Sequence, residues 1–214
     1  MSKKVLVAYA SKMGATAGIA QAIGDELRAH GHDVDVLDVA RVKDITPYDA
    51  VVLGSAIYIR RWRHEAVHFL RHHVDELRQR QVWLFHSGPV GPDKDQDQAM
   101  PPAVRHLAHE IGATPAVTFA GRLERETAGV MGRTSRQPWP LQAGEVITGF
   151  LARRLASGNL AGDVRDWDKI RRWAADISAA IEATQRSTWH RPPAGHSSAD
   201  QPGQPGVPSR STPK

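Results

Sequence analysis

Residues 4–16 read KVLVAYASKMGAT, and this stretch decides the fold. Its first seven residues are mainly apolar and include three aliphatic side chains in a row, as is typical of a buried strand. Residues 11–14 (SKMG) provide a turn, and apolar side chains then recur at helical spacing as far as residue 28. A strand, a tight turn and an amphipathic helix in this order open a parallel α/β sheet.

The same alternation continues along the rest of the chain. Further apolar strands are predicted at residues 34–39, 50–57, 81–86 and 116–121, and further helices at 62–80, 99–111 and 167–183. Right-handed crossovers leave few topologies for such a pattern. We therefore predict an α/β fold with a doubly wound, five-stranded parallel sheet in the order 2-1-3-4-5.

Two segments fall outside this pattern. Residues 122–165 are too long for a simple connection and form a predicted insert before the last helix. Residues 187–214 contain six of the fourteen prolines, with Ser and Gly between them, and predict a disordered tail. We therefore expect one domain over residues 1–186, followed by this tail.

Composition excludes several classes of protein. The apolar share of 41% is enough for a hydrophobic core, and no apolar run reaches the length of a transmembrane helix. With no cysteine, the chain has neither disulfides nor thiolate ligands. The net charge of +5 favours anionic partners in general, but no nucleic-acid-binding motif is present, so no nucleic-acid partner is predicted. The lack of a recognisable secretory signal favours a cytoplasmic protein.

Ligands of open parallel sheets bind outside the carboxyl ends of the strands, where the strand order reverses. In the predicted order this point lies beside the first and third strands. Three loops are therefore candidates for a binding site, at residues 11–16, 55–62 and 87–93. We call them the first, second and third loops.

The first loop has the features of an anion site. It joins a strand to the amino end of a helix, where backbone N–H groups and the helix dipole favour a phosphate. Its predicted binding residues are Ser11, Lys12, Met13, Gly14, Ala15 and Thr16. An ordinary strand-to-helix turn with a Ser cap remains the alternative. Neither the dinucleotide motif G-x-G-x-x-G nor the phosphate loop GxxxxGK[ST] is present.

The second and third loops suit a flat ring held against the backbone. Both begin with small residues, and the second also has two aromatic candidates for stacking, Tyr58 and Trp62. For both aromatics, a structural role at the surface or at a helix start is the alternative. The predicted ring-binding residues are Ser55, Ala56, Ile57, Tyr58 and Trp62 in the second loop, and Ser87, Gly88, Pro89, Val90 and Gly91 in the third.

The first loop is similar to the flavodoxin pattern [ST]-x-T-G-x-T and departs from it at Met13, where the family usually has Thr. Residues 1–184 resemble more specifically the menaquinone-dependent protoporphyrinogen IX dehydrogenase branch of the flavodoxin-like proteins. Four stretches carry this resemblance: VLVAYASKMGATAGIA (5–20), VVLGSAIYIRRW (51–62), AVTFAGRL (116–123) and DVRDWDKIRRWAADI (163–177).

The resemblance implies a flavodoxin-like fold, an FMN cofactor and oxidoreductase activity. The implied partners are a small-molecule electron donor such as a porphyrinogen, and a quinone or protein acceptor. A candidate helix at residues 145–156 carries apolar side chains beside Arg153 and Arg154, and it predicts peripheral contact with the inner face of a membrane. The alternative for this helix is docking on its own domain. No catalytic acid or base is predicted.

Competing hypotheses remain for function and for a metal site. A flavodoxin-type FMN electron carrier with no substrate of its own is the second hypothesis, and a nicotinamide-dependent quinone reductase is the third. His64, His68 and His72 recur at the i, i+4 spacing of zinc ligands, but no carboxylate ligand accompanies them, so no metal is predicted. A phosphoacceptor domain of the response-regulator type is excluded, because Gly54 and Ser55 stand where its acceptor Asp would end the third strand.

Overall fold

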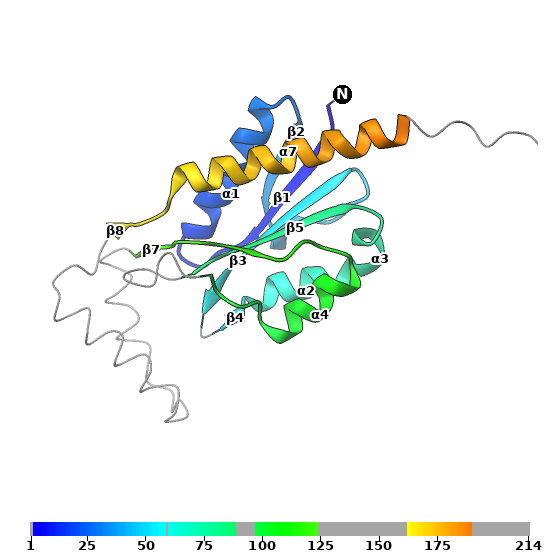
Figure 1. Ribbon diagram of the computed structural model, residues 1–214. Coiled ribbons are helices and arrows are strands. Elements are labelled where there is room, and N and C mark those ends of the chain that lie inside the picture. Colours follow the sequence, from blue (N-terminus) through cyan, green and yellow to red (C-terminus); the bar gives the residue numbers. More distant parts are fainter. Residues whose placement is uncertain (1, 59, 89–96, 124–161, 190–214) are drawn as a thin grey trace, which may run out of the picture.

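The computed structural model describes residues 2–58, 60–88, 97–123 and 162–189. Figure 1 shows the arrangement of its helices and strands. They are β1 (Lys4–Ala10), α1 (Ala15–Ala29), β2 (Asp33–Asp38), the 3-10 helix η1 (Val39–Arg41), β3 (Ala50–Tyr58), β4 (Arg61–Trp62), α2 (His64–His72), α3 (Val74–Leu77), β5 (Gln81–Ser87), α4 (Pro102–Glu110), β6 (Val117–Phe119), β7 (Arg122–Leu123), β8 (Gly162–Asp163) and α7 (Trp167–Trp189).

Five parallel strands form the central sheet, in the order β2-β1-β3-β5-β6. Counted without the short β4, this is the order 2-1-3-4-5 that the sequence predicts, so the α/β fold class is confirmed. The order reverses between β1 and β3, whose carboxyl ends therefore lie where ligands bind in this architecture.

Helices cover both faces of the sheet (Figure 1). Side chains alternate along β1, so that Val5 and Val7 pack toward α1 and α7, while Leu6 packs on the opposite face with α2 and α4. All three side chains are fully buried. This burial on both faces explains why the strands read as continuous apolar runs in the sequence.

The segment after β3 differs from the predicted helix at 62–80. Trp62 belongs to the short strand β4 and pairs antiparallel with Ile57 of β3. Arg60, with a φ of 58°, lies in the turn between the two strands. The helix itself begins at His64 and is interrupted at His73, whose φ of −108° and ψ of 23° separate α2 from α3. The hairpin places residues 60–62 at the ligand-binding edge instead of in a helix.

The last helix, α7, is longer than predicted. It runs to Trp189, beyond the predicted end at residue 183 and past the predicted tail boundary at 187. The first proline of the tail is Pro192, so the preceding residues contain no helix breaker. Residues 190–214 and most of the predicted insert lie outside the described residues, so the predicted disorder and the insert stay predictions.

A short ribbon joins the two ends of residues 124–161. Arg122 of β7 pairs antiparallel with Asp163 of β8, and Leu123 pairs with Gly162. The two ends of residues 124–161 are therefore neighbours in the structure.

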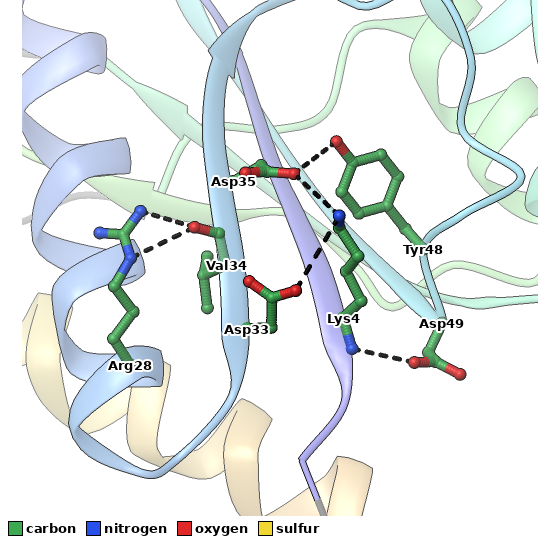
Figure 2. A network of polar contacts seen from close by, with 7 residues as sticks. All are labelled: Lys4, Arg28, Asp33, Val34, Asp35, Tyr48 and Asp49. Atoms are coloured by element: carbon green, nitrogen blue, oxygen red, sulfur yellow. Dashed lines mark hydrogen bonds and ion pairs between the residues drawn. The ribbon is translucent and has the colours of Figure 1, made fainter.

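A polar network closes the opposite, amino-terminal edge of the sheet (Figure 2). The ammonium group of Lys4 lies 3.6 Å from the Asp35 carboxylate, which also accepts a hydrogen bond of 2.8 Å from the Tyr48 hydroxyl. The backbone N–H of Lys4 donates to Asp49. Burial, together with the bond to Asp35, raises the pKa of Tyr48 to about 12, so the phenol stays protonated and keeps donating. These contacts tie β1 to β2 and to the chain before β3.

No helix in the described part of the chain is both long enough and apolar enough to cross a membrane.

Candidate functional site

The three predicted loops meet at the carboxyl edge of the sheet. The Thr16 hydroxyl, in the first turn of α1, lies 2.6 Å from the Ser87 hydroxyl at the end of β5. Gly88 lies so close to the second loop that a Cβ there would be 2.8 Å from a methyl carbon of Ile57. These contacts link the first loop to the third and the third to the second.

The first loop turns sharply into the amino end of α1. Gly14 caps the helix with a φ of 79°, a left-handed conformation that glycine adopts at little cost. Its N–H donates to the Ser11 hydroxyl at 3.0 Å, which fixes the turn. The first turn of α1 has no acidic residue, and Lys12 is exposed beside it. The loop therefore presents a helix amino end with a positive local charge, as an anion site requires.

Thr16 has a structural contact in addition to its predicted role. Its side chain is fully buried and shares a hydrogen bond with Ser87, so it fastens the first turn of α1 to β5. Met13 and Ala15 are partly buried. The predicted phosphate contacts of the first loop stay predictions.

The second loop is held by the Ser55 hydroxyl. It accepts the backbone N–H of Arg63 at 3.0 Å and donates to the carbonyl of Ala56. Ser55 and Ala56 are buried, whereas Ile57 is partly exposed at the end of β3. Tyr58 pairs with Arg61 through its backbone, and its side chain lies outside the described part of the structure.

Trp62 is the last residue of the second loop, and its side chain is buried in the core. Its side chain is 5% exposed, and its indole N–H donates to Nδ1 of His86 at 3.3 Å. The two rings meet edge to face, at an interplanar angle of 84°. The hydrogen bond to His86 thus supports a structural role for Trp62, and flavin stacking by Trp62 stays a prediction.

His86 is the centre of a buried chain of hydrogen bonds that the sequence did not predict. Because an indole N–H only donates, Nδ1 of His86 must accept, and the ring proton lies on Nε2. Nε2 is 2.9 Å from the Thr118 hydroxyl, which also accepts the backbone N–H of Gln98 at 2.8 Å. The chain connects β4, β5 and β6 directly beneath the third loop. The only signal in the sequence was a histidine at the end of an apolar strand.

Acidification is expected to weaken the fold through His86, by about 2 kcal/mol between about pH 7 and about pH 5. Burial lowers the pKa of His86 to about 4 in the folded protein, from 6.5 for an ordinary histidine. The unfolded chain therefore binds more protons as the pH falls from 6.5 toward 4, and stability that is complete above pH 6.5 is lost across this window.

Urea unfolding at the two pH values checks this expectation. The control is His86→Asn, whose amide oxygen can accept the Trp62 bond but does not titrate. Burial also lowers the pKa values of His32 and His73, but both residues remain in the control and their effects cancel. An equal loss of stability in wild type and variant would contradict the prediction.

The third loop is described only at its start. Ser87 is buried, and the N–H of Gly88 donates to the carbonyl of Phe119 at 3.0 Å, which fixes the direction of the chain as it leaves β5. Pro89, Val90 and Gly91 lie outside the described residues, so their predicted contacts stay predictions.

Basic side chains surround the three loops. Lys12, Arg60 and Arg61 are exposed at the first and second loops. Arg63 is partly buried and pairs with Glu65. Burial raises the pKa of Glu65, but the hydrogen bond from its own backbone N–H, together with the Arg63 guanidinium, holds this pKa below its ordinary value. The edge of the site is thus positively charged.

The histidines of α2 form no larger ligand cluster in the described residues. His68 and His72 stack at a centroid distance of 6.0 Å, but no group of three or more His, Cys, Asp or Glu side chains is placed to hold a metal ion there. His73, next in the chain, is buried. It therefore does not lie on the solvated face that His64, His68 and His72 share.

Comparison with solved structures finds the same architecture at low sequence identity. Rubredoxin oxygen:oxidoreductase from Desulfovibrio gigas aligns with a TM-score of 0.53 and 15% identity, over 85% of this chain and 37% of that one. The chain thus spans little more than a third of that enzyme's length. A flavodoxin variant from Pseudomonas aeruginosa aligns with a TM-score of 0.50 and 14% identity, over 84% of this chain and 99% of that one. At these identities both show the fold alone.

A search of curated proteins found no match. Residues 6–136, however, match the profile of the family described as Flavodoxin domain. The match covers more than half of the chain, and the protein therefore belongs to the flavodoxin domain family, whose members bind FMN.

Proposed function

We propose that the protein is an FMN-dependent oxidoreductase that takes electrons from a porphyrinogen-type donor and passes them to a quinone. One observation carries the proposal: in a flavodoxin domain, the first, second and third loops are joined to one another at the carboxyl edge of the sheet. The finer assignment to the protoporphyrinogen dehydrogenase branch rests on the four stretches of sequence that resemble it.

The first loop would hold the phosphate of FMN. Its chemistry fits that group, because a helix amino end, a glycine with open space above it and an exposed lysine come together without an acidic side chain. No atom of the described residues lies within 4 Å of the position that a Cβ on Gly14 would take, so a ligand can approach the backbone closely.

The second and third loops would hold the ring. Ser55 and Ala56 on one side, and Ser87 and Gly88 on the other, bring small residues to the same edge. When bound, FMN supplies the transfer of one or two electrons, and the protein supplies binding, orientation and the electrostatic surroundings. His86 lies below the third loop and stays neutral at physiological pH, so the buried polar group at this place adds no charge to the site.

The charge of the site supports an anionic small-molecule donor. Porphyrinogens carry carboxylate side chains, and the exposed Arg60 and Arg61 of the second loop, with Lys12 of the first, are suitable partners for such groups. The same charge disfavours the acidic docking face that is usual for short-chain flavodoxin carriers. Membrane contact through residues 145–156, which lie outside the described residues, remains part of the proposal as the route to a quinone.

The purified full-length chain tests the proposal in two steps. A visible spectrum and identification of the released flavin establish whether FMN is bound. Anaerobic mixing with protoporphyrinogen, with menadione as acceptor, then measures turnover. Protein that binds FMN but does not oxidise the porphyrinogen would favour the electron-carrier hypothesis, and a colourless protein that refuses added FMN would contradict both.

A further inference from the structure

A buried arginine from the far end of the chain touches the first turn of α1. The side chain of Arg165, between β8 and α7, is only 7% exposed. Its Nη1 donates to the backbone carbonyl of Ala15 at 3.3 Å. The contact joins two residues that are 150 positions apart in sequence, and it lies within the helical turn that the first loop opens.

Arg165 is held on its other sides as well. Its Nε donates to Asp163 at 2.7 Å, and a second donor, Nη2, reaches the other oxygen of the same carboxylate. The guanidinium plane is also close to an aromatic face, with its central carbon 4.2 Å from the ring centroid of Trp167. The bidentate carboxylate and the ring beside it together favour this orientation of a long, flexible side chain.

Gly18 makes room for this arginine. A Cβ at position 18 would lie 2.3 Å from Nη1 of Arg165, far closer than two non-bonded atoms approach. The absence of a side chain on this face of α1 therefore lets the guanidinium reach the Ala15 carbonyl. Glycine in a helix interior is unfavourable for helix formation. The room that Gly18 leaves for Arg165 explains why a glycine stands at this position of α1.

In the ion pair between Arg165 and Asp163, the guanidinium is the group that faces α1. It contacts the helix directly, whereas Asp163 is 36% exposed. The hydrogen bond from Arg165 is also the main reason why the pKa of Asp163 is held below its ordinary value, so the Asp163 carboxyl stays ionised at neutral pH. The amino end of a helix already carries a partial positive charge, and a buried cation near it makes the local electrostatic potential more positive. Solvent screens such a buried charge less than it screens a surface charge.

We propose that Arg165 is a positioning residue for the flavin phosphate: held by Asp163 and Trp167, it fixes the first turn of α1 and turns the positive end of an ion pair toward the first loop. This inference rests on the proposed function, because it takes FMN as the ligand of that loop. The phosphate is recognised by the backbone of residues 11–16, and Arg165 acts through that backbone.

Two variants remove the contact in different ways. Arg165→Gln removes the charge, and Gly18→Ala keeps the charge but displaces the guanidinium from the Ala15 carbonyl. Arg171→Gln is the matched control, since it removes an arginine of α7 that is 55% exposed and pairs only with Asp168, at 3.0 Å, among the contacts of the described residues. The dissociation constants of FMN and of riboflavin, which lacks the phosphate, are measured by fluorescence titration of the apoprotein, together with its melting temperature.

Arg165→Gln is expected to raise the dissociation constant of FMN about tenfold, because the first turn of α1 loses both its support and a nearby positive charge, and that of riboflavin less than about twofold. Gly18→Ala should also weaken FMN binding, while the melting temperature of its apoprotein stays equal or rises because Ala is the better helix former. Arg171→Gln should leave both flavins unaffected.

Three results would overturn the inference, and they are distinguishable. If wild type binds FMN and both variants bind it within twofold of wild type, Arg165 has no part in phosphate binding. If FMN and riboflavin weaken equally and the apoproteins melt earlier, Arg165 only holds the fold together. If wild type binds neither flavin, the proposed function itself fails, and this inference fails with it.

Discussion

Gly14→Asp is expected to bind FMN about 100-fold more weakly than Gly14→Asn, because a carboxylate about 5 Å from a phosphate repels it by a few kcal/mol at the effective dielectric of a protein surface. Gly14 is the cap of α1 and has a φ of 79°. Asp and Asn tolerate this left-handed conformation about equally well, so the comparison isolates the charge. The flavin affinities follow from fluorescence titration of the two apoproteins.

The stability of the same two apoproteins should change in the opposite direction. Without a phosphate, a carboxylate at the amino end of a helix is favourable. The free energy of unfolding of the Gly14→Asp apoprotein should therefore be about 0.5 kcal/mol higher than that of Gly14→Asn. The substitution has space, since the part of the chain that the structure describes leaves the surroundings of the new Cβ empty to 4 Å. Equal FMN affinities in the two variants would show that the phosphate binds elsewhere, even if the protein is yellow.

Gly54→Ala is expected to destabilise the fold by at least about 3 kcal/mol, at the upper end of what overpacked cores cost. A Cβ on Gly54 would lie 2.0 Å from Cζ of Phe85, the residue directly opposite on β5. The Phe85 ring has nowhere to move, because it is fully buried and packs at centroid distances of 5.8 Å from Phe119 and 5.9 Å from Trp173. Urea unfolding of the apoprotein measures the loss.

A second substitution distinguishes this clash from a general sensitivity of β3. Phe85→Leu shortens the opposing side chain, so the double variant Gly54→Ala, Phe85→Leu should be less destabilised than the sum of the single variants by about 1 kcal/mol or more. Simple additivity would mean that the two residues do not compete for the same space. Because Gly54 directly precedes the second loop, the clash would also displace Ser55 from its bond to the backbone of Arg63.

The strands and their order could be predicted from the sequence because burial on both faces leaves a signal along the chain itself. Val5 and Val7 belong to one continuous apolar run and Val52 to another, and the two runs pair as neighbouring strands of the sheet. The apolar faces of α1 and α7 likewise each show the helical spacing in their own segment. Residue identity at the ends of strands also located the three loops. The family, too, was recognisable from the first loop, although the comparisons support the flavodoxin domain and not the branch within it.

The details of the site could not be predicted because they depend on pairs of residues that are distant in sequence. Thr16 and Ser87 are 71 positions apart, and neither segment contains a sequence pattern that predicts their contact. The predicted helix start at residue 62 is wrong for a different reason. Trp62, Ala66 and Phe69 are all buried and have the spacing of one helix face, although Trp62 lies in a strand. The left-handed turn at Arg60 folds Trp62 back onto β3, so that it pairs with Ile57 in a hairpin instead of opening the helix. A non-glycine residue with positive φ carries little warning in sequence.

The ribbon of β7 and β8 has a consequence for how this domain can diversify. With residues 122–123 and 162–163 already paired, the entropy of closing the intervening segment grows only with the logarithm of its length. Segments of very different size and character can therefore be exchanged between these two short strands without a large penalty to the sheet. A segment held by this ribbon can therefore acquire new contacts while the sheet and the helices packed on it stay unchanged.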